Sequence, residues 1–100
     1  MTTSIQSIDG KIIATLSGEL DTAAAAEVES ALQPLLESEG SDIVIDCTDL
    51  EYIASSGLRI LLSILKKARA SGGRVTLRNV NDLIRDVFQM TGFIDIFEFE

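Results

Sequence analysis

The junction between an apolar strand and an apolar helix constrains this chain more than any other feature. Residues 42–47 (DIVIDC) form a short apolar run that predicts a buried strand. Leucines at positions 58, 61, 62 and 65 then repeat at the spacing of a helix. Ser55 and Ser56 lie between the two patterns, so we expect both at the N-terminus of that helix.

A helix N-terminus gives these hydroxyls a specific chemistry. The first amides of a helix have no acceptor within the helix, and the macrodipole adds about half a positive charge there. A serine at this position either caps the helix, which contributes about 1 kcal/mol, or carries a phosphate whose charge the helix tolerates. The local pattern leaves both roles open for Ser55.

The rest of the chain alternates between strand and helix patterns. Asp9-Gly10 favours a tight hairpin turn, and Pro34 predicts a kink near the end of the first helix. Short connections between such elements favour an α/β fold, a small mixed sheet of about four to five strands flanked by helices, in one domain over residues 1–100. The expected elements are strands at 4–7 and 11–17, an interruption at 18–22, a helix from there to about 40, a strand at 42–47, a helix from 55 to about 71, a strand at 75–77, a helix capped by Asn81 or Asp82 and closed by Thr91-Gly92, and a strand-like tail at 93–99.

Charge and composition exclude several classes of function. The 100 residues include 16 acidic and 8 basic side chains, and this excess argues against binding nucleic acid or an anionic membrane surface. The one cysteine, Cys47, cannot form an internal disulfide, so we expect a buried, unreactive thiol in a cytoplasmic protein. We expect no cofactor and no metal, because histidine is absent and Asp46 and Asp49 are better explained by turns.

Catalysis finds no support in the sequence either. Serine hydrolase chemistry needs a base, and the chain has neither a histidine nor a suitably placed Ser-x-x-Lys pair. No P-loop and no Gly-x-Gly-x-x-Gly turn is present. We therefore expect a protein that binds partners and is not an enzyme.

Three motifs, in this order and spacing, resemble the STAS domain of bacterial anti-sigma factor antagonists. They are Gly18-Glu19-Leu20-Asp21 before the first helix, residues 49–58 (DLEYIASSGL) before the second, and Thr91-Gly92-Phe93 near the end. The resemblance covers nearly the whole chain and implies a small mixed sheet flanked by helices.

The resemblance also implies a modification site. In that family the second motif commonly reads Asp-Ser-Ser/Thr/Ala-Gly-Leu, and the serine after the Asp is phosphorylated. That serine corresponds to Ser55, with Ser56 the less favoured acceptor, and Ala54 replaces the family's Asp.

A partner-switching cycle follows from the same resemblance. The unphosphorylated protein would bind an anti-sigma factor serine kinase with a histidine-kinase-like ATPase fold and thereby free a sigma factor. Phosphorylation of Ser55 would release the protein, acting on the interface and not on the fold, and a PP2C-type phosphatase would reset it. The alternative is a STAS subunit that is not phosphorylated and has a structural role, for example in a lipid-transport ATPase complex, and Ala54 gives this alternative weight.

The partner-binding surface is expected where these motifs meet. Several candidates also have a simpler interpretation, with Asp21 as a helix cap, Arg59 as a solvated side chain and Gly57 as a position of close packing. The resemblance favours partner contacts. The residues expected on this surface are Glu19, Asp21, Thr22, Ala54, Ser55, Ser56, Gly57 and Arg59.

Overall fold

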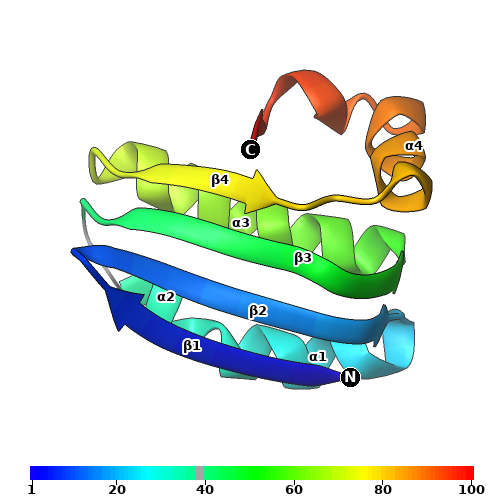
Figure 1. Ribbon diagram of the computed structural model, residues 1–100, viewed down its shortest axis with the longest axis horizontal. Coiled ribbons are helices and arrows are strands. Elements are labelled where there is room, and N and C mark those ends of the chain that lie inside the picture. Colours follow the sequence, from blue (N-terminus) through cyan, green and yellow to red (C-terminus); the bar gives the residue numbers. More distant parts are fainter. Residues whose placement is uncertain (38–39) are drawn as a thin grey trace.

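A five-stranded sheet with helices on one face organises the computed structural model, which describes residues 1–37 and 40–100 (Figure 1). The strand order is β1-β2-β3-β4-β5, with β1 antiparallel to β2 and the other pairs parallel. This mixed sheet confirms the predicted fold class. The elements are β1 (Thr2–Ile8), β2 (Lys11–Leu20), α1 (Thr22–Ala31), α2 (Gln33–Glu37), β3 (Asp42–Ile53), α3 (Ser55–Ala70), β4 (Arg74–Arg78), α4 (Asp82–Met90), the short 3-10 helix η1 (Phe93–Asp95) and β5 (Glu98–Phe99).

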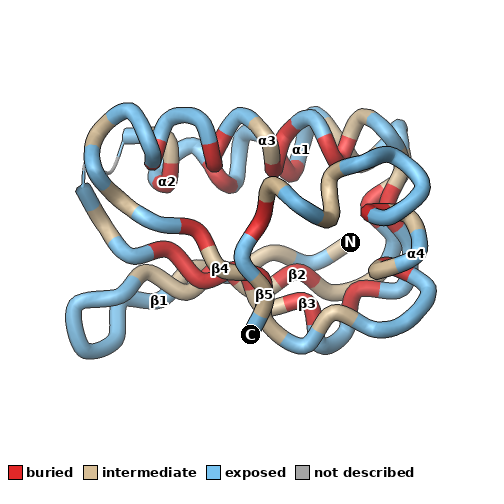
Figure 2. Tube along the Cα trace, turned by 90° about the horizontal axis from the view of Figure 1, so that it is seen from above, coloured by how far each residue is buried: buried red, intermediate tan, exposed pale blue. Residues whose placement is uncertain are grey.

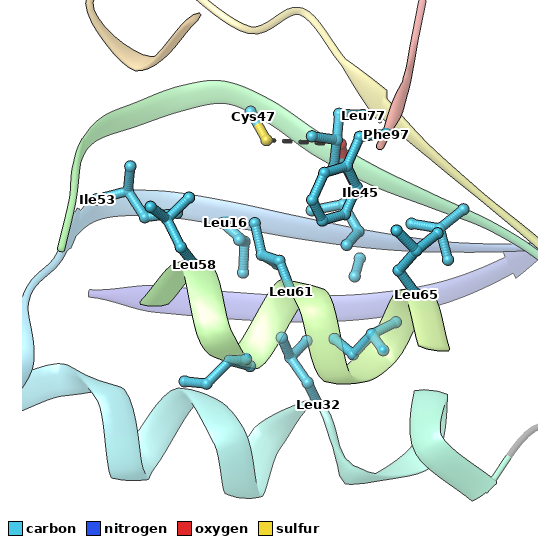
Figure 3. Packing of buried hydrophobic residues seen from close by; sticks show 14 of the residues in the cluster. Leu16, Leu32, Ile45, Cys47, Ile53, Leu58, Leu61, Leu65, Leu77 and Phe97 are labelled. Atoms are coloured by element: carbon cyan, nitrogen blue, oxygen red, sulfur yellow. Dashed lines mark hydrogen bonds between the residues drawn. The ribbon is translucent and has the colours of Figure 1, made fainter. Parts of the chain in front are cut away.

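The helix α3 supplies the centre of the core. Helices α1, α2 and α3 form one layer over the sheet, while the opposite face of the sheet carries no helix in the described chain (Figure 2). Leu58, Leu61 and Leu65 of α3 are buried against the sheet and α1, as the leucine spacing predicted (Figure 3). Burying side chains of this kind contributes about 1.5–3 kcal/mol each, so α3 is held firmly in place.

Two local predictions are confirmed at the turns. Asp9 and Gly10 both have positive φ, 51° and 79°, and connect β1 to β2 as a tight hairpin. The first helix breaks at Leu32 into α1 and α2, with Pro34 in the first turn of α2. Proline is tolerated in the first turn of a helix, because the amides there have no acceptor within the helix and the missing N–H of proline costs no hydrogen bond. The final residues of the helix predicted to run to about residue 40 include 38–39, which lie outside the described residues.

Two predicted strand ends are wrong. β2 continues through residues 18–20, and β3 continues through Asp49 to Ile53, where an interruption and turns were expected. The register between the two strands shifts after Thr15 and again after Gly18, with one extra residue in β3 at each place. Such bulges let both strands continue past polar residues until Leu20 and Ile53 reach the core.

The C-terminal segment is strand-like only at its end. Residues 93–95 form η1, and β5 pairs with β4 over two positions. The ring of Phe97 lies 5.5 Å from that of Phe88, and the ring of Phe99 lies 5.7 Å from it, both edge to face. Phe97 and Phe99 thus pack on Phe88 and hold the C-terminal segment against α4.

Candidate functional site

The two predicted junctions lie side by side. Leu20, the last residue of β2, is paired with Ile53, the last residue of β3, and the Ala54 amide donates to the Leu20 carbonyl at 2.8 Å. Asp21 and Ala54 therefore follow neighbouring strands at the same end of the sheet. The structure thus brings the first helix N-terminus next to that of α3.

Gly57 fixes how closely α3 approaches the sheet. It is buried, and a Cβ atom there would lie 2.7 Å from Leu20 Cγ and 3.0 Å from Ile53 Cγ1. Contacts this short require the neighbouring side chains to move, so only glycine fits without rearrangement. Close packing of α3 against the sheet therefore explains why a glycine stands at position 57.

The two serines of the motif have different environments. Ser55 is exposed and is the first residue of α3. The Oγ atom of Ser56 exposes less than 1 Å² and has no hydrogen-bond partner among the described residues. An enzyme that modifies this segment can reach the hydroxyl of Ser55 directly, whereas the Ser56 hydroxyl is reached only if the helix end moves.

The interpretation of Ser55 as a helix cap is wrong. Ala54 occupies the cap position, with the extended backbone (φ −87°, ψ 169°) that this position requires, and no side chain caps α3. The Leu58 amide donates to the Ala54 carbonyl at 3.0 Å, so the amides of residues 55–57 precede the first intrahelical bond. With no acidic side chain in its first turn, α3 retains the positive end of its dipole.

The other two long helices near this end of the sheet are capped. Asp21 Oδ1 accepts a hydrogen bond from the Ala24 amide at 2.8 Å, which confirms the predicted cap of α1. Asn81 Oδ1 accepts from the Ile84 amide at 2.9 Å and caps α4, also as predicted. Of these three helices, only α3 has a cap residue whose side chain cannot accept a hydrogen bond.

A groove between α1 and α3 brings together three of the predicted site residues. Its volume is about 360 Å³, and its lining includes small side chains from both helices. Thr22, Ser56 and Arg59 all line it, although they are far apart in the sequence. The complete lining consists of Thr22, Ala25, Ala26, Glu29, Ser56, Arg59, Ile60 and Ser63.

A second, acidic hollow lies beside the N-terminus of α1. It encloses about 420 Å³ and contains the predicted residues Glu19 and Asp21. Glu27 and Glu51 line it as well, and the sequence interpretation missed both. Glu27 follows Ala24 at helical spacing, so the helix pattern could have placed it on this face, whereas Glu51 enters only through the bulged pairing of β2 and β3.

Cys47 and its neighbours form no reactive site. Cys47 is fully buried, and burial, reinforced by Asp46, raises the pKa of its thiol to about 12. One carboxylate oxygen of Asp46 accepts hydrogen bonds from the amide and the hydroxyl of Thr48. Within residues 1–37 and 40–100, no group of three or more His, Cys, Asp or Glu side chains is arranged to hold a metal ion. No helix in the same residues is long and apolar enough to cross a membrane.

The STAS domain model matches residues 2–100. BtrV of Bordetella bronchiseptica, named "Putative anti-sigma factor antagonist", is 34% identical over 97 residues, covering 97% of this chain and 84% of BtrV. The anti-sigma-B factor antagonist of Bacillus subtilis is 30% identical over 90 residues, covering 90% of this chain and 82% of the relative. The chain therefore belongs to the STAS domain family.

Solved structures of the anti-sigma factor antagonist SpoIIAA share the fold. The unphosphorylated form superposes with a TM-score of 0.81 and 22% identity, covering 99% of this chain and 88% of SpoIIAA. The phosphorylated form from Bacillus superposes with a TM-score of 0.73, also at 22% identity, covering 99% of this chain and 91% of the other. The chain therefore shares its overall fold with SpoIIAA.

Proposed function

We propose that this protein is an anti-sigma factor antagonist that works by phosphorylation-controlled partner switching. In its unphosphorylated form it binds an anti-sigma factor serine kinase with a histidine-kinase-like ATPase fold, and the sigma factor is freed. Phosphorylation of Ser55 releases the antagonist, and a PP2C-type phosphatase restores it. The family and the relatives that carry this name support the proposal.

The observation that carries the proposal is the exposed hydroxyl of Ser55 at the uncapped N-terminus of α3. A phosphate there gains from the dipole and from amides without intrahelical acceptors. The close packing of Gly57 against Leu20 holds this helix end in place, so the phosphate is accommodated without rearrangement of the fold.

The partner surface consists of the α1/α3 groove and the acidic hollow on either side of the first turn of α1. Arg59 and Thr22 contact the partner from the groove, and Glu19 and Asp21 from the hollow. The carboxylates of the hollow favour a basic patch on the partner.

Phosphorylation breaks the complex at the contact itself. Phosphoserine carries about −1.5 to −2 charges at neutral pH and three additional oxygens. A partner packed closely over Ser55 leaves no space for the added oxygens and no water to solvate their charge. Ala54 keeps this contact free of charge in the unphosphorylated state, because it adds no carboxylate beside the acceptor.

The test is phosphosite mapping after incubation with ATP and a candidate anti-sigma factor kinase. We expect intact mass to increase by one phosphate in the native protein and in Ser56→Ala, and not in Ser55→Ala. This matched pair of neighbouring serines separates loss of the acceptor from disturbance of the helix end. A tight complex with the kinase and no phosphate on Ser55 would contradict the proposal and favour a constitutive structural subunit.

A further inference from the structure

The two edge strands of the sheet, β1 and β5, differ in length and in charge. β5 closes one edge with two residues, while β1 forms the other edge with seven. An edge strand presents unpaired amides and carbonyls that another strand can bind, and proteins usually block it with charges, proline, bulges or short length. The two edges can therefore be compared by their length, charge, proline content and bulges.

Arginines hold and protect the β5 edge. Four of the chain's eight basic residues contact the last five residues. The contacts join Arg69 to the Ile96 carbonyl at 2.7 Å, Arg74 to Glu98 at 2.8 Å, Arg78 to Glu100 at 2.9 Å, and Arg85 to the face of the Phe99 ring at 4.8 Å from its centre. Short length and a high density of charge make this edge a poor template for another strand.

The β1 edge has none of these devices. Its sequence, TTSIQSI, contains no charged residue, no proline and no glycine. Its pairing with β2 runs without a bulge from Thr2 opposite Ser17 to Ile8 opposite Lys11. The strand is thus long, regular and neutral along its whole length.

The neutral β1 strand lets a second copy of this chain approach with little charge repulsion. The chain carries a net charge of −8, so most pairs of surfaces on two copies repel each other. The α1 face carries Glu27 and Glu29, and the acidic hollow adds Glu19 and Glu51. β1 is a neutral strip, so two copies that pair through it oppose no charged side chains within the two strands.

We propose that two copies of this chain pair through their β1 strands, antiparallel and related by a two-fold axis at Ile5. Centred there, the pairing aligns all seven residues and sets Ser4 opposite the second copy's Gln6. Ser4, Gln6 and Ile8 lie on the face of the sheet that carries no helix, whereas Ile5 packs toward the core. A shift of the pairing by one residue would place core-facing residues of one copy opposite solvent-facing residues of the other. The product is a continuous ten-stranded sheet.

The dimer leaves both switch sites free. The start of β1 lies beside the end of β2, because Thr2 pairs with Ser17, so it points to the same end of the sheet as Ser55. The two-fold axis turns the second copy around, and the two Ser55 residues lie at opposite ends of the extended sheet. The β1 pairing therefore leaves Ser55 uncovered in both copies.

The test is sedimentation velocity at about 10 μM to about 1 mM protein, because strand-edge interfaces are small and interfaces below about 1,200 Å² are usually weak. The native chain should move from monomer towards dimer across this range. The variant S4K/Q6K sets lysines opposite lysines and should stay monomeric, although it lowers the net negative charge and so reduces the general repulsion between copies. The variant S4K/Q6E sets lysine opposite glutamate and should dimerise at least as well as the native chain.

Circular dichroism and thermal melts establish that both variants are folded. A native chain that remains monomeric at about 1 mM, or an S4K/Q6K variant that associates as the native chain does, would overturn the proposal. Loss of the dimer in S4K/Q6E as well would overturn the antiparallel register centred on Ile5.

Discussion

The N-termini of α1 and α3 lie side by side and are built in opposite ways. The cap residue of α1 is Asp21, whose carboxylate accepts a hydrogen bond from the Ala24 amide, whereas the cap residue of α3 is Ala54, whose side chain cannot accept one. The missing cap is offset by packing, because Gly57 lets α3 approach Leu20 and Ile53 closely. A helix end fixed by packing stays open to solvent at its first amides, and a charge can be added to it without competing with a cap.

The largest effect is expected when that packing is broken. Gly57→Ala adds a Cβ atom 2.7 Å from Leu20 Cγ, and we expect a loss of about 1–3 kcal/mol of unfolding free energy from overpacking. Chemical denaturation measures it. The same substitution in a Leu20→Ala background should cost less, because the clashing atoms are gone, and an equal cost in both backgrounds would contradict the contact as the cause.

Removing the caps of the closed helix ends should cost less. Asp21→Ala and Asn81→Ala should each lower the unfolding free energy by about 1 kcal/mol. Asn81→Ala should be the more costly of the two, because Asn81 Nδ2 also donates to the Leu50 carbonyl at 2.9 Å. Denaturant midpoints compare the two variants directly, and no loss in either would mean that these caps do not stabilise the helices.

Supplying the missing cap should make α3 resemble α1. Ala54→Asp should raise the unfolding free energy by about 1 kcal/mol, since a carboxylate at this position can accept from the second or third amide of the helix. Ala54→Asn is the matched variant that can cap without a charge and should give a similar gain. A loss of stability in both would show that the backbone at residue 54 does not suit a side-chain cap.

The smallest effect is expected at Ser55 itself. Ser55 is exposed and its side chain makes no hydrogen bond within the described residues, so Ser55→Ala should change the unfolding free energy by less than about 0.5 kcal/mol. Thermal and chemical unfolding of the variant check this. A loss comparable to that of Asp21→Ala would indicate a capping role for Ser55 and would weaken the contrast between the two helix ends.

The sequence predicts these elements well where local patterns decide the structure. The leucine spacing of α3, the Asp9-Gly10 turn and the caps Asp21 and Asn81 depend on nearby residues alone. Whether Ser55 or Ala54 occupies the cap position depends on the backbone angles of a single residue, and sequence patterns place helix ends only to within a few positions.

The features that sequence patterns did not predict depend on pairing between residues far apart in the chain. β2 and β3 continue beyond their predicted ends because each supports the other through two register shifts. The acidic hollow likewise depends on Glu51 of β3 lying beside α1 and β2, which no local pattern encodes. The helix ends that carry the candidate site residues were thus predictable from the motifs, while the surface around them depends on the fold.

The most direct test of the proposed switch is the affinity of this protein for a candidate anti-sigma factor kinase before and after phosphorylation of Ser55. Isothermal titration with a non-hydrolysable ATP analogue keeps the two forms distinct, and Ser55→Ala serves as the unmodifiable control. We expect the phosphorylated form to bind at least about tenfold more weakly, a difference of about 1.4 kcal/mol, with Ser55→Ala binding like the unmodified protein. Equal affinities of the phosphorylated and unphosphorylated forms would contradict partner switching at Ser55.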